Sequence, residues 1–439
     1  MRHDDNRMVS AFVGRPSAFD HHTLSAFVGR PSAVGTHHSP GTGYRVPETE
    51  PGFGIRDSGL APRALGRAGS PSPAATPRPA RSGHAHRSAI AVVASIVLGG
   101  VVVSAQAPKV AITPKPAEKK VEVTVDGKPF TTYMWPDSLE KPVLYPLVTA
   151  GGTTITRGFP PGPNERQDHP HHVGLWFNYG DVNGFDFWNN SDAIKPEQKA
   201  KMGSVEHREV VKTESRGDHA VLQVKADWVA GDGKTLLNET TTFTFRAAAN
   251  GARMIDRVTT LAAAPGTGTV KMTDNKEGML GLRVVRPLED PAEKSGEFKD
   301  AAGRVTKMAD MDTSGVTGQY LSSEGKVGKD VWGTRGAWTK LSGSVNGKDV
   351  TVAILDAPGN PGYPTYWHAR GYGLFAANPL GQAALSEGKD TLNFSITEGK
   401  PATFRYRILL LDSNASAAEM QKYAQAWAST SGGSPSSNR

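Results

Sequence analysis

The stretch GFPPGPNERQDHPHHVGLWFNYGDVNGFDFWN, residues 158–189, is the part of the chain densest in chemically reactive side chains. It holds three His, two Trp and four Asp or Glu residues. Proline and glycine make residues 158–167 a loop. From 171 to 179 the residues alternate, which predicts a strand whose core face carries His171, Val173, Leu175, Phe177 and Tyr179. The opposite face would carry His172, Gly174, Trp176 and Asn178. A glycine inside a strand indicates close approach of a ligand or of another backbone segment.

Charge and cysteine content indicate which partners and which sources of stability this chain can have. The chain has 439 residues, a formal charge of +7 and no cysteine. Residues 1–105 contribute 11 Arg against 6 Asp or Glu, and the remainder 39 Lys or Arg against 37 Asp or Glu. The excess charge therefore belongs largely to the leader, and we predict no nucleic-acid partner. Without cysteine there are no disulfides or thiolate metal sites, so stability must come from a large core.

The first 105 residues are predicted to lie outside the folded domain. Residues 1–83 are rich in Gly, Pro, Ser and Arg, repeat the nonapeptide SAFVGRPSA twice, and are expected to be disordered. Residues 84–105 have the basic, apolar and small-residue regions of a signal peptide, with cleavage before Gln106. We therefore expect an exported protein, periplasmic or extracellular, with a membrane tether only if the signal stays uncleaved. Because signals begin near the N-terminus, the true start is expected downstream of Met1.

The mature part reads as all-β. After a linker at 106–120, the domain is expected over 121–428, with a disordered tail at 429–439. Asp126-Gly127 predicts a hairpin between 121–125 and 128–134, and Asn346-Gly347 another turn. Further strands are expected at 143–148, 205–212, 219–228, 236–246, 253–261, 279–285, 336–341, 350–355, 366–376, 392–397 and 403–411. This number of strands predicts a large antiparallel β-sandwich. A capping box, Ser416 to Glu419, begins one C-terminal helix.

Two further strands carry polar residues on one face. In the first, Glu277, Met279, Gly281 and Arg283 would lie opposite the core. In the second, 366–376, one face would carry Tyr366, His368, Arg370 and Tyr372. Together with the strand of His172, they predict a concave site on a sheet. Because Asp274, Asn275 and Gly278 favour turns, we expect the chain to bend at Glu277 and bring it beside the histidines.

These residues suit acid–base chemistry on a sugar. His titrates near neutrality and burial can tune Glu, so His172, Glu277 and His368 are the catalytic candidates. The expected substrate-binding residues, which include two arginines for an oxyanion or carboxylate, are Trp176, Asn178, Arg283, Tyr366 and Arg370. No cofactor is favoured. A divalent metal stays open as an alternative, with His169, His171 and His172 as its ligands. The chain has no GxSxG, P-loop or GxGxxG motif.

Several motifs in order resemble a known family. DHPHHVGLWFNYGDVNGFDFW, DNKEGMLGLRV, RGAWTKLSG and PTYWHARGYGLFAANPLG resemble the bacterial DUF6807 family, long labelled "methane oxygenase PmoA". The resemblance implies an exported β-rich protein linked with sugar catabolism. Its label implies a metal-dependent oxygenase, but a true subunit of that kind spans the membrane several times, and this chain has one short apolar segment. Thr156-Arg157-Gly158-Phe159-Pro160 before the His cluster is also similar to aldose-epimerase sandwiches.

The sequence therefore predicts an exported carbohydrate-active enzyme, an epimerase, lyase or hydrolase, with a small-molecule or oligosaccharide ligand. One alternative is a non-catalytic glycan-binding module, which would keep the aromatic residues and need no acid–base pair. The other is the oxygenase of the family label.

Overall fold

The computed structural model describes residues 107–293, 296–299, 305–308 and 312–431. The predicted leader (1–83), signal peptide (84–105) and most of the tail lie outside these residues. Within them, no helix is long and apolar enough to cross a membrane.

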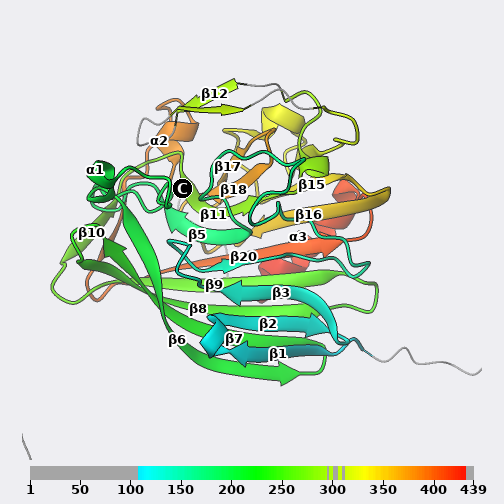
Figure 1. Cartoon of the computed structure of the whole chain (residues 1–439), viewed down its shortest axis with the longest axis horizontal. Coiled ribbons are helices and arrows are strands. Elements are labelled where there is room, and N and C mark those ends of the chain that lie inside the picture. Colours follow the sequence, from blue (N-terminus) through cyan, green and yellow to red (C-terminus); the bar gives the residue numbers. More distant parts are fainter. Residues whose placement is uncertain (1–106, 294–295, 300–304, 309–311, 432–439) are drawn as a thin grey trace, which may run out of the picture. The chain divides into compact units, whose positions relative to one another are not determined.

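Two eight-stranded antiparallel sheets make up the described part of the chain (Figure 1). The first sheet runs in the order β1 (Val110–Lys115), β2 (Lys120–Val125), β3 (Lys128–Met134), β4 (Val143–Leu144), β5 (Leu175–Tyr179), β11 (Gly278–Arg283), β18 (Leu374–Asn378) and β17 (Tyr366–Ala369). The second sheet runs in the order β14 (Gln319–Ser322), β15 (Trp338–Val345), β16 (Lys348–Asp356), β20 (Ala402–Leu411), β9 (Arg253–Ala263), β8 (Thr235–Ala247), β7 (His219–Ala230) and β6 (Gly203–Arg216). The predicted all-β antiparallel sandwich is confirmed.

Smaller elements complete the fold. Two separate two-stranded sheets pair β10 (Thr269–Met272) with β19 (Phe394–Thr397) and β12 (Gly296–Lys299) with β13 (Val305–Met308). The helices are α1 (Pro196–Lys199), α2 (Gln382–Leu385), α3 (Ala417–Thr430) and the 3-10 turns η1 (Pro116–Glu118), η2 (Arg286–Leu288) and η3 (Gly328–Val331).

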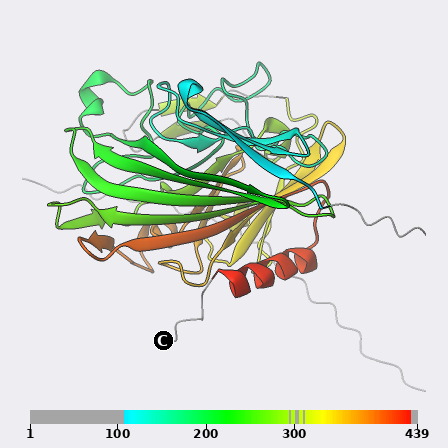
Figure 2. The ribbon, with the colours of Figure 1, turned by 90° about the horizontal axis from the view of Figure 1, so that it is seen from below.

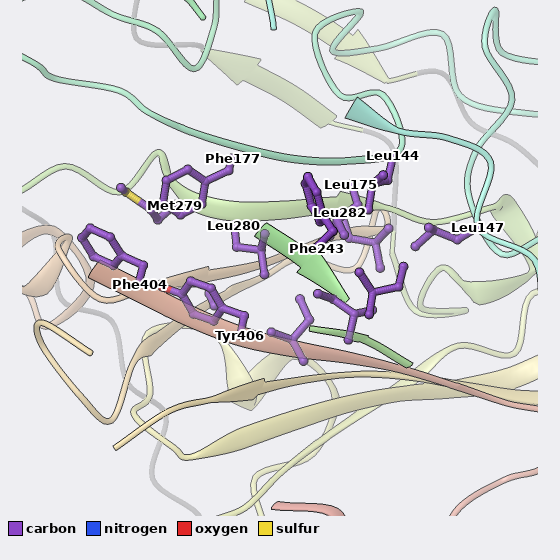
Figure 3. Packing of buried hydrophobic residues seen from close by; sticks show 14 of the residues in the cluster. Leu144, Leu147, Leu175, Phe177, Phe243, Met279, Leu280, Leu282, Phe404 and Tyr406 are labelled. Atoms are coloured by element: carbon purple, nitrogen blue, oxygen red, sulfur yellow. The ribbon is translucent and has the colours of Figure 1, made fainter. Parts of the chain in front are cut away.

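The main core lies between the two sheets. In β7 every second residue from Ala220 to Trp228 is buried while Lys225 is exposed, as the alternation predicted. The first sheet contributes Leu175, Phe177, Leu280 and Leu282, and the second contributes Phe243, Phe404 and Tyr406 (Figure 3). Their side chains meet because the period of two sends alternate residues to one face of each sheet.

Helix α3 covers the outer face of the second sheet (Figure 2). Ser416 Oγ accepts a hydrogen bond from the backbone N–H of Glu419 at 3.2 Å, so the predicted helix cap is confirmed. Met420 and Trp427 are buried against Trp338 and Leu409. With α3 on this side, the outer face of the first sheet is available for other contacts.

Three predicted strands were wrong in extent. The strand expected from His171 begins only at Leu175, because Gly174 (φ +59°) leaves the extended region. A Cβ on Gly174 would lie 2.3 Å from the carbonyl oxygen of Leu144, so this glycine marks the approach of another backbone segment. The strand expected over 143–148 ends at Leu144, two residues before Pro146, which has no N–H to donate to a ladder.

The third correction concerns residues 366–376, expected as one strand. They form two antiparallel strands, β17 and β18, which pair His368 with Ala376. The Gly373 N–H donates to the Arg370 carbonyl at 3.0 Å and closes the turn between them. Gly373 has φ +88°, a conformation that glycine adopts without strain. Arg370 and Tyr372 therefore lie in a turn and do not share a strand face with His368.

Candidate functional site

The outer face of the first sheet carries the candidate residues. One row of cross-strand neighbours runs Trp176, Gly281, Ala376 and His368 across β5, β11, β18 and β17. The two middle residues are small. A Cβ on Gly281 would lie 2.5 Å from the Trp176 ring and 2.8 Å from Trp188. The glycine therefore gives both indoles room to lie over the sheet.

Aromatic rings form a stack above this face. The ring of His169 is parallel to Tyr372 at 5.2 Å and to His172 at 4.7 Å between centroids. His172 in turn stacks on Trp176 at 5.1 Å. Trp188 contacts Trp176 at 5.1 Å. The loop that carries these histidines, residues 166–172 and called the histidine loop below, is thus packed onto the sheet through ring contacts.

Arg157 fixes the conformation of the histidine loop. Its guanidinium donates to the backbone carbonyls of Arg166, Asp168, His169 and His172 at 2.7–3.0 Å. These carbonyls are buried, and each would cost free energy without a donor. One side chain therefore closes residues 166–172 into a compact turn over the sheet.

Asp168 and Arg283 form a buried ion pair beneath that loop. Arg283 Nη2 lies 2.9 Å from Asp168 Oδ1 and Nη1 lies 3.1 Å from Oδ2. Asp168 also contacts His169 Nδ1. Burial acts to raise the pKa of Asp168, but the charges of Arg283 and His169 outweigh it and hold this pKa well below its usual range. Asp168 is therefore ionised across the physiological range.

His172 is held neutral in this cluster. Arg283 Nη1 lies 3.3 Å from His172 Nδ1. Because a guanidinium only donates, Nδ1 accepts and the ring proton lies on Nε2. Burial, with the neighbouring His171 and His169, holds the pKa of His172 well below its ordinary value. His172 therefore presents an N–H donor and no charge.

Glu277 lies before β11, where the expected bend is confirmed. Asn275 Oδ1 accepts from the Glu277 backbone N–H at 2.9 Å and turns the chain there. Glu277 Oε2 then lies 3.9 Å from His368 Nδ1, and Oε1 lies 3.4 Å from Lys276 Nζ. Glu277 and His368 are 7% and 2% exposed, so their charges are poorly hydrated.

Burial shifts both members of this pair toward their neutral forms. It raises the pKa of Glu277, which Asp186 also raises and Lys276 and Arg370 partly oppose. Burial, with Arg370 and Lys276, lowers the pKa of His368 to about 3. His368 Nδ1 is buried, has no hydrogen-bond partner among the described residues, and lies toward Glu277 Oε2.

A cavity adjoins Glu277. Its volume is about 400 Å³, and its lining includes Gly180, Asp186, Glu197 and Asn275. Gly180 and Asn275 are direct neighbours of Glu277. This cavity therefore lies next to the backbone turn that carries Glu277.

Other sequence candidates lie in different surroundings. Trp176 is fully buried, with His172 stacked on it and Lys141 Nζ 5.6 Å from its ring centre. Asn178 is also fully buried, and its Nδ2 donates to the Phe187 carbonyl at 2.5 Å. Tyr366 donates to Asp390 Oδ2 at 2.5 Å. The structure thus brings His172, Glu277, Arg283 and His368 onto one face, with Arg370 at its edge. It packs the Trp176 ring against His172, and it gives Asn178 Nδ2 and the Tyr366 hydroxyl protein acceptors.

Several buried N–H groups of the stacked rings, called the aromatic cluster below, lack a hydrogen-bond partner among the described residues. Among the described residues none accepts from His172 Nε2, Trp176 Nε1 or Trp188 Nε1. Buried polar groups are nearly always hydrogen-bonded, so such donors need an explanation. An oxygen-rich ligand or ordered water would satisfy them.

The alternative metal site would need the three histidines of this loop to converge on one point. His171 and His172 lie 4.3 Å apart and His169 and His171 5.6 Å apart between ring centroids. No group of three or more His, Asp or Glu in the described part of the chain is arranged to hold a metal ion.

Comparison with known proteins identifies the family. The profile described as "Family of unknown function (DUF6807)" matches residues 120–425, more than half of the chain. The chain belongs to the DUF6807 family. No curated protein matches it. The resemblance read from the motifs is thereby confirmed, whereas the oxygenase label that accompanies it is not addressed by this match.

Some solved structures are similar to this DUF6807 chain at low identity. Galactose 1-epimerase from Lactobacillus acidophilus NCFM is 10% identical, with 71% of this chain and 100% of that chain covered and a TM-score of 0.34. A glycoside hydrolase family 97 enzyme from Pseudoalteromonas sp. strain K8 is 9% identical. The match covers 70% of this chain and 34% of that chain, with a TM-score of 0.26. A GalM/aldose epimerase homologue from C. elegans is 7% identical. The match covers 70% of this chain and 100% of that chain, with a TM-score of 0.26.

Sequence reasoning missed three charged residues of this DUF6807 site. Arg157 and Asp168 flank the histidine loop, and Lys141 donates to the His171 carbonyl at 2.8 Å. All three are at most 4% exposed. The available signal was that Arg157 and Asp168 bracket a Pro/Gly-rich loop and could neutralise each other. Nothing in the sequence around Lys141 distinguishes it from a surface lysine.

Proposed function

We propose that the protein is a carbohydrate-active enzyme in which Glu277 and His368 are the acid–base pair. The observation that carries this proposal is the 3.9 Å approach of Glu277 Oε2 to His368 Nδ1 in a buried setting. The raised pKa of Glu277 makes its carboxylate a stronger base than an exposed one, and the low pKa of His368 leaves its ring uncharged beside that carboxylate.

A sugar fits the remaining groups. Its hydroxyls would accept from the unpaired N–H groups of His172, Trp176 and Trp188, which lie in one aromatic cluster. A cavity of about 400 Å³ beside Glu277 has room for a monosaccharide unit. A non-catalytic glycan-binding module would use the same donors, so the acid–base pair is what separates the two functions.

Glu277→Gln is expected to abolish turnover in a screen of sugars and glycosides, while shifting Tm by only a few degrees. Glutamine keeps the shape of the side chain and removes its charge. Burying a neutral amide costs no more free energy than burying a carboxylate, so the fold should keep its stability. His368→Ala should also lower turnover strongly. Because activity needs ionised Glu277, wild-type kcat/KM should rise with pH through the raised pKa, above the usual carboxyl range.

The matched control is Glu387→Gln, whose side chain is 78% exposed, and it should retain wild-type turnover. Turnover by Glu277→Gln at the wild-type rate would remove the acid–base role. Binding of glycans without turnover by any variant or by the wild type would favour the binding module.

Export is part of the proposal and is motivated by the signal pattern at residues 84–105. The exported protein is expected to begin at Gln106, and N-terminal sequencing of material from the native host checks this. A mature N-terminus upstream of residue 84 would contradict it.

A further inference from the structure

Arg370 differs from the other arginines near the Glu277–His368 pair. Arg283 pairs with Asp168, and Arg166 and Arg286 pair with Glu289. Within the described residues, the Arg370 side chain makes no hydrogen bond or ion pair, and its Nε is buried. Its Cζ lies 5.3 Å from the ring centre of Trp332. A guanidinium on an aromatic face keeps its N–H edge free for an anion.

The backbone of Arg370 is nevertheless fixed. Its N–H donates to the Leu374 carbonyl at 2.8 Å, and its carbonyl accepts from Gly373 and from the Tyr320 hydroxyl at 3.0 and 3.3 Å. The unpaired side chain is thus attached to a rigid turn. A group placed in this way is prepared for a ligand at little cost in entropy.

The charge of Arg370 acts on the acid–base pair. It lowers the pKa of His368, second only to burial, and also lowers that of Glu277. Lys276 adds a second cation, because its Nζ lies 3.4 Å from Glu277 Oε1. Two cationic side chains, Arg370 and Lys276, therefore act on the Glu277–His368 pair and would favour an anionic group on a ligand bound there.

We propose that the substrate is a carboxylated sugar, a uronic acid, whose carboxylate binds Arg370. This inference rests on the proposed function. In a hexuronate the carboxylate carbon is bonded to C5, so a carboxylate on Arg370 directs the C5–H bond toward Glu277. The C5–H bond breaks, Glu277 takes the proton, and the electron pair moves into the carboxylate as an enediolate that Arg370 stabilises. Return of a proton to C5 balances the step without a cofactor.

A carboxylate fits better than a phosphate. One planar guanidinium matches a carboxylate with two parallel N–H bonds. Phosphate sites usually add backbone N–H groups at a helix N-terminus or a glycine-rich loop, and Arg370 lies in a turn between two strands. A dianion beside Glu277 would also meet stronger repulsion than a monoanion.

The test is hydrogen exchange at C5. Wild-type protein is incubated in D₂O with the methyl glycosides of glucuronic and galacturonic acid in both anomeric forms, and with their short oligomers. Loss of the C5 proton signal is followed by NMR. Glucuronamide and methyl glucosides serve as uncharged probes. We expect exchange with the acids only. Arg370→Gln should slow it at least 100-fold, Arg370→Lys should restore part of the rate, and the distant control Arg208→Gln should equal the wild type.

The outcomes separate this inference from the proposed function. Exchange or turnover of uncharged sugars at the rate of the acids would overturn the uronate inference and leave the acid–base proposal intact. Absence of any exchange or turnover with every sugar would overturn both. Should Arg370→Gln fail to fold, the comparison of acids with uncharged probes in the wild type still decides the question.

Discussion

Replacing Asp168 with asparagine is expected to destabilise the fold by about 3–5 kcal/mol. The change leaves Arg283, which is 0% exposed, with a neutral partner. Arg157 Nη1, 3.5 Å from Asp168 Oδ1, loses its only carboxylate within the described residues as well. An asparagine can accept from Arg283 through one oxygen only, so the two-point contact is lost.

The pH dependence of the wild type has a defined sign. The pKa of Asp168 is lowered in the folded state, so its contribution to stability is fully present above its unfolded value of about 3.9. That contribution is lost as pH falls toward the folded pKa. The difference in unfolding free energy between wild type and Asp168→Asn should therefore shrink below about pH 4.

Urea unfolding at several pH values measures this difference. Asp192→Asn is the matched control, because Asp192 is exposed and lies in a nearby loop. A loss of under 1 kcal/mol for Asp168→Asn, or equal losses for both variants, would show that the buried pair does not hold the histidine loop.

The fold was predictable because its signals are local. Alternation in β7 and the two-residue turns at Asp126-Gly127 and Asn346-Gly347 each depend on a few adjacent residues. The helix cap at Ser416 also depends on a few adjacent residues. Each such signal fixes an element and its buried face. The period of two at residues 175–179 therefore gave the core face of β5 correctly.

The site was less predictable because it depends on pairing between distant strands. Trp176 neighbours Gly281 across β5 and β11, and Gly281 neighbours Ala376 across β11 and β18. The pairing register between distant strands depends on the whole sheet. A single stretch of sequence therefore does not show which residues become cross-strand neighbours. Arg370 was misplaced for a related reason, because a turn of four residues interrupts a pattern that alternates on both sides of it.

Charged residues inside loops were the hardest to recognise. Arg157 looks like a solvent-exposed residue next to a glycine, yet it donates to four carbonyls. Burying a charged arginine costs free energy, and these four hydrogen bonds offset that cost. Those acceptors come from backbone positions up to fifteen residues away, and their arrangement exists only after the loop has folded.

Lys141→Met is expected to stabilise the protein at neutral pH and to change how stability depends on pH. Burial lowers the pKa of Lys141 to about 7, although Glu140 and Asp186 oppose that shift. Between about pH 7 and 10.5 the unfolded chain therefore binds more protons at this residue than the folded chain. Wild-type stability must then rise with pH across that window, by about 5 kcal/mol at most.

Methionine has a similar length and no charge to bury, so the variant avoids this penalty at and below about pH 7. It also loses the 2.8 Å hydrogen bond to the His171 carbonyl, which costs about 1 kcal/mol. The two stability curves should therefore cross, with the variant more stable at pH 7 and the wild type equal or more stable near pH 10. Unfolding from pH 6 to 10 measures the difference, and groups that titrate in both proteins cancel. Lys329→Met, at a side chain 90% exposed, should show no such pH-dependent difference. A constant offset between wild type and Lys141→Met across this range would mean that Lys141 stays protonated in the folded protein.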